Sequence, residues 1–189
     1  MENIKANVLL DAKGLACPMP IVKTKKAINQ LEEGFVLEVQ ATDKGSKVDL
    51  KAWAGSTGHQ YLGTLEDGDV LKHFIRKSST SETFEKKHSN VITNEELEKK
   101  LINNENIVLL DVRESAEYAF NHIHKAISIP MGELEQRLDV LNKDSEIYVI
   151  CRTGSRSDLA AQKLSENGFM KVVNVLPGMS QWKGVTISR

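Results

Sequence analysis

The chain has 189 residues, of which 40% are hydrophobic, and its formal net charge is −1 at pH 7. This length allows one large core or two compact ones, because domains commonly contain roughly 100 to 150 residues. A balanced charge argues against nucleic-acid binding, which favours a strongly basic face. No apolar run approaches the roughly 20 residues of a membrane-spanning helix, and the first residues lack the pattern of a signal peptide. We therefore expect a cytoplasmic protein that binds neither nucleic acid nor membrane.

Residues 1–77 show alternating strand and helix patterns. The predicted elements are a strand at 8–11, a helix at 18–31, a strand at 35–41, a helix at 45–55 and strands near 60–62 and 70–75. The order βαβαββ predicts a two-layer α/β sandwich in which two helices cover a four-stranded sheet. The residues expected to be buried are Ile21, Ile28 and Leu31 in the first helix and Val48, Ala52 and Trp53 in the second.

Residues 78–90 are polar, poor in aliphatic side chains and without periodicity. Such a composition does not support a packed element, so we interpret this segment as a linker between two domains.

Residues 91–189 have the pattern of an α/β domain. Thr93 followed by Glu96 predicts a capping box at the start of a helix. Three apolar runs are typical of buried parallel strands, and they lie at 107–110, 147–150 and 172–176. Helical patterns at 133–141 and 155–167 lie between them. Strands that alternate with helices predict a central parallel sheet.

Cys151 follows the apolar run 147–150 and stands in a short loop that leads directly into a predicted helix. Backbone N–H groups of such a loop, together with the helix N-terminus, favour a bound anion. We expect these surroundings to favour a thiolate nucleophile and an anionic persulfide. The residues expected to bind the donor around Cys151 are Arg152, Thr153, Gly154, Ser155, Arg156 and Ser157.

This segment resembles the active-site loop of the rhodanese family, and the resemblance extends over residues 89–189. Further matches are Asp111, Arg113, Glu117, His122, Pro177-Gly178, Trp182 and Gly184. We interpret the first four of these as a hydrogen-bonded framework beneath the loop. Asn121 and Lys125 stand where the family usually has glycine, and we expect a local adjustment at Asn121 because Asn tolerates a left-handed backbone.

A cysteine phosphatase loop is the nearest alternative interpretation of this segment. Cysteine phosphatases and related arsenate reductases need Cys-x5-Arg, whose arginine binds the oxygens of a tetrahedral anion. Position 157 is serine, and Arg156 comes one residue too early. The shorter loop favours a single transferred sulfur atom over a phosphoryl group.

Cys17 precedes Pro18 and Pro20 at the predicted start of a helix. We expect Cys17 at the N-cap with Pro18 at the first helical position, and we expect the helix dipole to lower the pKa of the thiol. Gly14 should allow the preceding loop to expose the sulfur. An isolated Cys-Pro pair is, however, also compatible with an ordinary helix start.

The pattern Asp-x-x-Gly-x-x-Cys-Pro-x-Pro over residues 11–20 resembles the signature of the TusA-like (SirA-like) sulfur-carrier family. The resemblance covers residues 7–77 and agrees with that family's two-layer fold. It implies that Cys17 holds sulfur as a persulfide.

The two resemblances together predict a rhodanese-type sulfurtransferase. Cys151 would take sulfane sulfur from thiosulfate or a low-molecular-weight persulfide and pass it to Cys17 or to an external thiol protein. The two cysteines and five histidines never fall at metal-ligand spacing, so no metal site is expected. No organic cofactor is implied either. The alternative is a persulfide carrier or redox-sensing binding protein without small-molecule turnover of its own.

Overall fold

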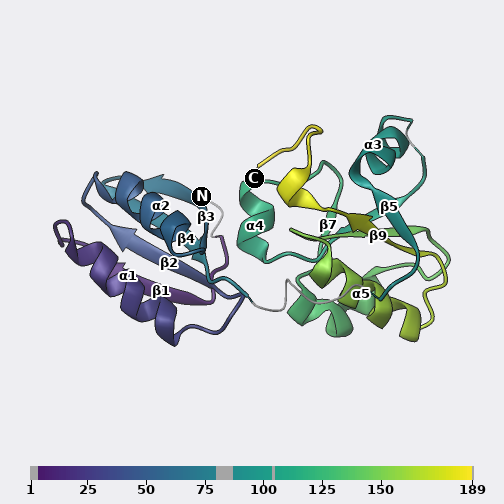
Figure 1. Ribbon diagram of the computed structural model, residues 1–189, viewed down its shortest axis with the longest axis horizontal. Helices are drawn as coiled ribbons and strands as arrows, with labels where there is room; N and C mark the ends of the chain where they lie inside the picture. The colour runs from purple at the N-terminus through teal and green to yellow at the C-terminus, as the bar shows by residue number, and fades with distance from the viewer. Residues whose placement is uncertain (1–3, 80–86, 104, 189) are drawn as a thin grey trace. The chain divides into compact units, whose positions relative to one another are not determined.

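The computed structural model describes residues 4–79, 87–103 and 105–188, and the chain divides into two compact units, Met1–Ser79 and Thr80–Arg189 (Figure 1). Residues 80–86, the middle of the segment predicted to be a linker, lie outside the described residues. None of the described helices is long and apolar enough to cross a membrane.

The first unit is a four-stranded sheet with two helices. Its elements are β1 (Val8–Ala12), α1 (Met19–Gln30), β2 (Val36–Ala41), α2 (Ser46–Ser56), β3 (Gln60–Asp67) and β4 (Val70–Arg76). The strand order is β1-β2-β4-β3, with β1 parallel to β2 and the other pairs antiparallel. The predicted order βαβαββ is confirmed.

The core of the first unit lies between the helices and one face of the sheet. Ile28 of α1 and Leu50 of α2 pack with strand residues such as Val39. The predicted burial of Ile28 and Leu31 is confirmed, whereas Ile21 is only partly buried.

The helix predicted at 45–55 is present as α2, but the residues expected to be buried on it were wrong. This helix buries Ser46, Leu50 and Ala54. Val48 is 72% exposed, Ala52 is exposed and Trp53 is only partly buried. Because the first core position of α2 is a serine, the buried positions of this helix do not form a hydrophobic repeat in the sequence.

The second unit is a five-stranded parallel sheet. Its elements are β5 (Val91–Thr93), α3 (Asn94–Ile102), β6 (Val108–Asp111), α4 (Ser115–Phe120), β7 (Ile127–Ser128), η2 (Met131–Val140), β8 (Ile147–Ile150), α5 (Ser155–Glu166), β9 (Val172–Leu176) and η3 (Met179–Gln181). The strand order is β5-β9-β8-β6-β7, and every pair is parallel. The predicted central parallel sheet and the Thr93–Glu96 capping box are confirmed. The helix predicted at 133–141 is instead a 3₁₀ helix that is interrupted at Arg137.

Helices cover both faces of this sheet (Figure 1). On one face Val149 packs with Leu134 of η2 and Leu164 of α5. On the other face Tyr148 and Ile150 pack with Leu97 of α3. Successive residues of β8 therefore point into different cores, which explains why this strand is continuously hydrophobic.

Residues 87–90, at the end of the segment predicted to be a linker, are hydrogen-bonded to the second unit. The Lys87 and His88 N–H groups donate to the Asp158 carboxylate at 3.0 and 2.9 Å. The Asn90 side-chain amide donates to the Val172 carbonyl at 2.9 Å. The chain is therefore anchored to the first turn of α5 before β5 begins.

Candidate active site

Cys151 stands at the carboxyl end of the buried strand β8, immediately before α5. It is 0% exposed, and Gly154, the last residue before α5, has the left-handed φ of 89°. In open parallel sheets, ligands bind near the carboxyl ends of the strands. The turn at Gly154 thus places a helix N-terminus directly beside a cysteine at such an end.

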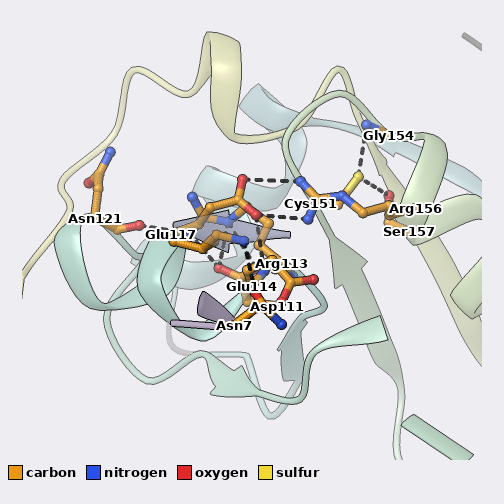
Figure 2. A network of polar contacts seen from close by, with 11 residues as sticks. Asn7, Asp111, Arg113, Glu114, Glu117, Asn121, Cys151, Gly154, Arg156 and Ser157 are labelled. Carbon is orange, nitrogen blue, oxygen red and sulfur yellow. Dashed lines mark hydrogen bonds and ion pairs between the residues drawn. The ribbon is translucent and has the colours of Figure 1, made fainter. Parts of the chain in front are cut away.

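The Cys151 sulfur lies beside a backbone N–H and a side-chain hydroxyl group (Figure 2). The Gly154 N–H donates to Sγ at 3.1 Å, and the Ser157 Oγ lies 3.3 Å from it. A backbone N–H directed at the sulfur can stabilise negative charge on it.

Residues after β9 hold the outer side of the cysteine loop. The Met179 N–H donates to the Cys151 carbonyl and the Ser180 N–H to the Arg152 carbonyl, both at 2.9 Å. Because a carbonyl and the N–H of the same trans peptide point in opposite directions, the N–H groups of Arg152 and Thr153 point away from η3. The loop therefore keeps donors on the side opposite η3.

Gly178 and Asn94 fix this contact. A Cβ at Gly178 would lie 2.5 Å from the Cys151 carbonyl oxygen, closer than side chains can pack. The buried Asn94 amide donates to the Gly178 carbonyl at 3.0 Å and accepts from its N–H at 3.3 Å. Sequence reasoning missed Asn94, whose signal is a polar residue directly after the helix cap at Thr93.

Arg156 forms a buried ion pair with a carboxylate of another helix. Its guanidinium donates to both Glu117 oxygens, at 2.8 and 3.1 Å, and both side chains are buried (Figure 2). Donor binding by Arg156 stays a prediction, and its guanidinium is directed at Glu117. The pair joins α4 to α5 beneath the loop.

The other predicted framework residues are buried and hydrogen-bonded. Arg113 donates to Asp111, with Nη2 and Oδ2 2.6 Å apart, and to the Asn121 carbonyl at 2.6 Å. The His122 Nδ1 lies 2.7 Å from the Tyr118 carbonyl oxygen. These contacts agree with a structural role for Asp111, Arg113 and His122.

The remaining predicted loop residues differ in exposure. Arg152 and Thr153 are partly exposed, whereas Gly154, Ser155 and Ser157 are buried. Of the two arginines in the loop, Arg152 is therefore the partly exposed one.

Cys17 occupies the loop between β1 and α1 in the first unit and is exposed. Gly14 has the left-handed φ of 73°, and its N–H donates to the Thr42 Oγ1 at 2.9 Å. As predicted, a turn at Gly14 precedes an exposed cysteine. The helix begins at Met19 with Pro18 in the capping position, so Cys17 lies one residue further from α1 than predicted.

The electrostatic environment of Cys17 is the reverse of the one expected. A hydrogen bond to Asp49 raises the pKa of the Cys17 thiol, and loss of solvent and the charges of Asp49 and Asp43 act in the same direction. The expectation of a lowered pKa was wrong, because α2 and the loop before it place carboxylates beside the sulfur. These neighbours disfavour the thiolate form of Cys17.

Comparison with known proteins gives a consistent result for both units. A family model described as Sulfurtransferase TusA matches residues 8–77, and one described as Rhodanese-like domain matches residues 93–184. YrkF of Bacillus subtilis (strain 168), named as a candidate sulfur carrier protein, is 50% identical over 183 residues, which are 97% of this chain and 99% of YrkF. The chain belongs to this family, in which a TusA domain is joined to a rhodanese-like domain.

Two further similarities concern one domain each. The sulfur carrier protein TusA of Allochromatium vinosum is 45% identical over 69 residues, which are 36% of this chain and 91% of that protein. The crystal structure of a rhodanese-like domain protein from Staphylococcus aureus has a TM-score of 0.50 and 33% identity, over 53% of this chain and 98% of that one.

The rhodanese-like domain also contains a buried polar group that sequence reasoning missed. Asn174 is 0% exposed in β9, between valines. Its side chain contacts both Ser157 and Gly154. A single polar residue within an apolar strand run was the available signal.

Proposed function

We propose that the protein takes sulfane sulfur from thiosulfate or a low-molecular-weight persulfide onto Cys151 and passes it to Cys17 or to an external acceptor thiol. The Cys151 thiolate attacks the outer sulfur of thiosulfate. A new S–S bond to Cys151 forms as the donor's S–S bond breaks, and sulfite leaves with the electron pair of the broken bond. Negative charge thereby moves from Sγ to the outer sulfur of the persulfide.

The observation that carries this proposal is the direction of the hydrogen bonds around Cys151. Gly154 donates to the sulfur, and contacts to Met179 and Ser180 hold the loop carbonyls away. With the carbonyls held, the N–H groups on the opposite side of the loop and the N-terminus of α5 can stabilise the charge that develops on the outer sulfur. Arg152 adds positive charge at the partly exposed side of the loop.

Cys17 is the proposed intramolecular acceptor because it is exposed and carries the family signature of a sulfur carrier. Both cysteines belong to one chain, and the segment predicted from the sequence to be a linker would raise the effective concentration of one thiol at the other into roughly the millimolar range.

Mass spectrometry with limiting thiosulfate labelled in its outer sulfur tests the relay. Wild type should show label on both cysteines, and Cys17→Ser should retain it on Cys151. Cys151→Ser should leave Cys17 unlabelled, because the hydrogen bond to Asp49 raises the pKa of the Cys17 thiol and so reduces the thiolate that could attack thiosulfate directly. Labelling of Cys17 at the wild-type rate without Cys151 would show that the domains act independently.

The carrier hypothesis has a specific observation in its favour, since Cys17 is exposed to partners whereas Cys151 is buried. In that case Cys151 only charges Cys17, and the protein has no turnover with small acceptors. Multiple turnovers of thiosulfate with cyanide would support the enzyme, and a single stoichiometric loading would support the carrier.

An aryl phosphate tests the remaining alternative for the loop. The arginine nearest the position that a phosphatase needs is Arg156, whose guanidinium is occupied by Glu117. We expect no hydrolysis of p-nitrophenyl phosphate, and hydrolysis that disappears in Cys151→Ser would contradict the proposal.

A further inference from the structure

Asn174 connects β9 to the first turn of α5. Its Nδ2 donates to the Gly154 carbonyl at 3.2 Å and lies 3.5 Å from the Asp158 Oδ1. Both of these atoms are acceptors, so the amide nitrogen faces them and the amide oxygen faces Ser157. The Ser157 Oγ lies 2.6 Å from the Asn174 Oδ1. The neighbours of the side chain thus define the orientation of its amide.

The Ser157 hydroxyl has one hydrogen and two neighbouring acceptors. The Asn174 oxygen is 2.6 Å from Ser157 Oγ, and the Cys151 sulfur is 3.3 Å from it. Two oxygens 2.6 Å apart must have a hydrogen between them, and the amide oxygen carries none, so the hydrogen is that of the Ser157 hydroxyl. The hydrogen therefore lies on the Asn174 side, and the Ser157 oxygen presents lone pairs to the sulfur.

We propose that Asn174 is a positioning residue for the chemistry at Cys151: by binding the Ser157 hydrogen, it prevents Ser157 from donating to the sulfur. The Cys151 thiolate then receives a hydrogen bond from the Gly154 N–H but not from Ser157. A thiolate with fewer hydrogen bonds is the stronger nucleophile, and fewer bonds must be broken when charge leaves Sγ for the outer sulfur. This inference rests on the proposed role of Cys151 as the nucleophile.

Alkylation of Cys151 by iodoacetamide tests the inference without requiring sulfur transfer. All proteins carry Cys17→Ser, which leaves Cys151 as the single cysteine. The alkylation rate constant is measured at high pH, where it no longer changes with pH. There it reports the nucleophilicity of the thiolate rather than the fraction of thiolate. Two substitutions remove the amide oxygen that accepts the Ser157 hydrogen. Asn174→Val introduces a side chain that suits a β-strand, and Asn174→Ala introduces a smaller one that leaves space in the core. Thermal unfolding identifies which of these variants are folded.

The expected result is a rate constant about three- to tenfold lower in the Asn174 variant, the effect of one added hydrogen bond to the thiolate. In a Ser157→Ala background the same Asn174 substitution should have no effect, because no hydroxyl remains to turn toward the sulfur. Such non-additivity in a double-mutant cycle indicates that Asn174 acts through Ser157.

Val175→Ala is the matched control, because Val175 is the next residue of β9, is 0% exposed and contributes to the opposite core. It should leave the rate constant within about twofold of the parent, since it alters strand packing without touching Ser157. An unchanged rate constant in the Asn174 variants, or an equal loss with and without Ser157, would overturn the inference. Failure of thiosulfate to load wild-type Cys151 would instead refute the proposed function.

Discussion

The two cysteines of this chain have opposite hydrogen-bonding environments. Cys151 is buried, and the Gly154 N–H donates to its sulfur at 3.1 Å. Cys17 is exposed, and a hydrogen bond to the Asp49 carboxylate raises the pKa of its thiol. Donors stabilise a negative sulfur, whereas a carboxylate stabilises a protonated one. A cysteine-containing loop before a helix therefore does not by itself determine the state of the thiol.

This difference suggests a division of labour within the proposed relay. A sulfur that faces a backbone N–H beside the N-terminus of α5 is suited to receive an anionic donor. An exposed thiol with a raised pKa has less thiolate to attack a small donor, but it remains accessible to a protein that presents activated sulfur. Substitutions at and around each cysteine can test whether its environment has the effect assigned to it.

The largest effect should come from Cys151→Ser. Oxygen cannot replace the sulfur nucleophile, so the rate of thiocyanate formation from thiosulfate and cyanide should fall roughly a thousandfold or more. Cys17→Ser is the matched control and should retain thiocyanate formation. An equal loss in both variants would mean that small-molecule turnover needs both cysteines and that the environments are not independent.

Gly178→Ala should lower activity by roughly ten- to a hundredfold, because displacement of a reacting group by about 1 Å has effects of that size. The added Cβ would lie 2.5 Å from the Cys151 carbonyl oxygen, at a residue whose φ is 91°. The loop would have to move. Gly132→Ala is the control in the same unit, because a Cβ added there would meet no atom within 4 Å. Equal activities of the two variants would show that η3 does not hold the loop.

Much of the fold followed from the sequence, since hydrophobic periodicity and turn residues are local signals. The order βαβαββ, the three central strands of the second sheet and the Thr93 capping box were predicted. The short strands β5 and β7 were not, because two or three residues at a sheet edge carry too little pattern. The α2 face was assigned incorrectly because Ser46 occupies a core position, where it hydrogen-bonds the buried His73 at 2.9 Å.

The site was predictable where chemistry depends on adjacent residues and unpredictable where it depends on distant ones. The cysteine loop and Gly154 were recognised, but the partner of Arg156 is Glu117 on another helix. The carboxylate beside Cys17 likewise comes from α2. The two residues that stand where the family usually has glycine also differ in backbone conformation: Asn121 is extended, with φ −163°, whereas Lys125 has the left-handed φ of 65°.

Arg156→Ala distinguishes a structural role of this residue from donor binding. Removal of one member of a buried ion pair leaves an uncompensated charge, so the free energy of unfolding of the second unit should fall by about 3–5 kcal/mol. The control is Lys163→Ala, since the Lys163–Glu135 pair is exposed and should contribute about 0–1 kcal/mol. Urea unfolding followed by Trp182 fluorescence measures both in a Trp53→Phe background. A stable Arg156→Ala variant with a raised KM for thiosulfate would support the donor-binding role.

The smallest expected effect concerns the environment of Cys17. The hydrogen bond to Asp49 raises the pKa of the Cys17 thiol, so Asp49→Asn, which removes the negative charge, should lower it. A lower pKa gives more thiolate at a given pH, and the pH midpoint for alkylation of Cys17 should move downward. The measurement uses iodoacetamide in a Cys151→Ser background, where Cys17 is the single cysteine.

Asp67→Asn is the matched control, because that carboxylate is held by Lys72 at 2.6 Å. If Asp49→Asn leaves the midpoint unchanged, or Asp67→Asn moves it equally, the raised pKa of Cys17 does not arise from Asp49. The comparison between the two cysteines would then rest on exposure alone.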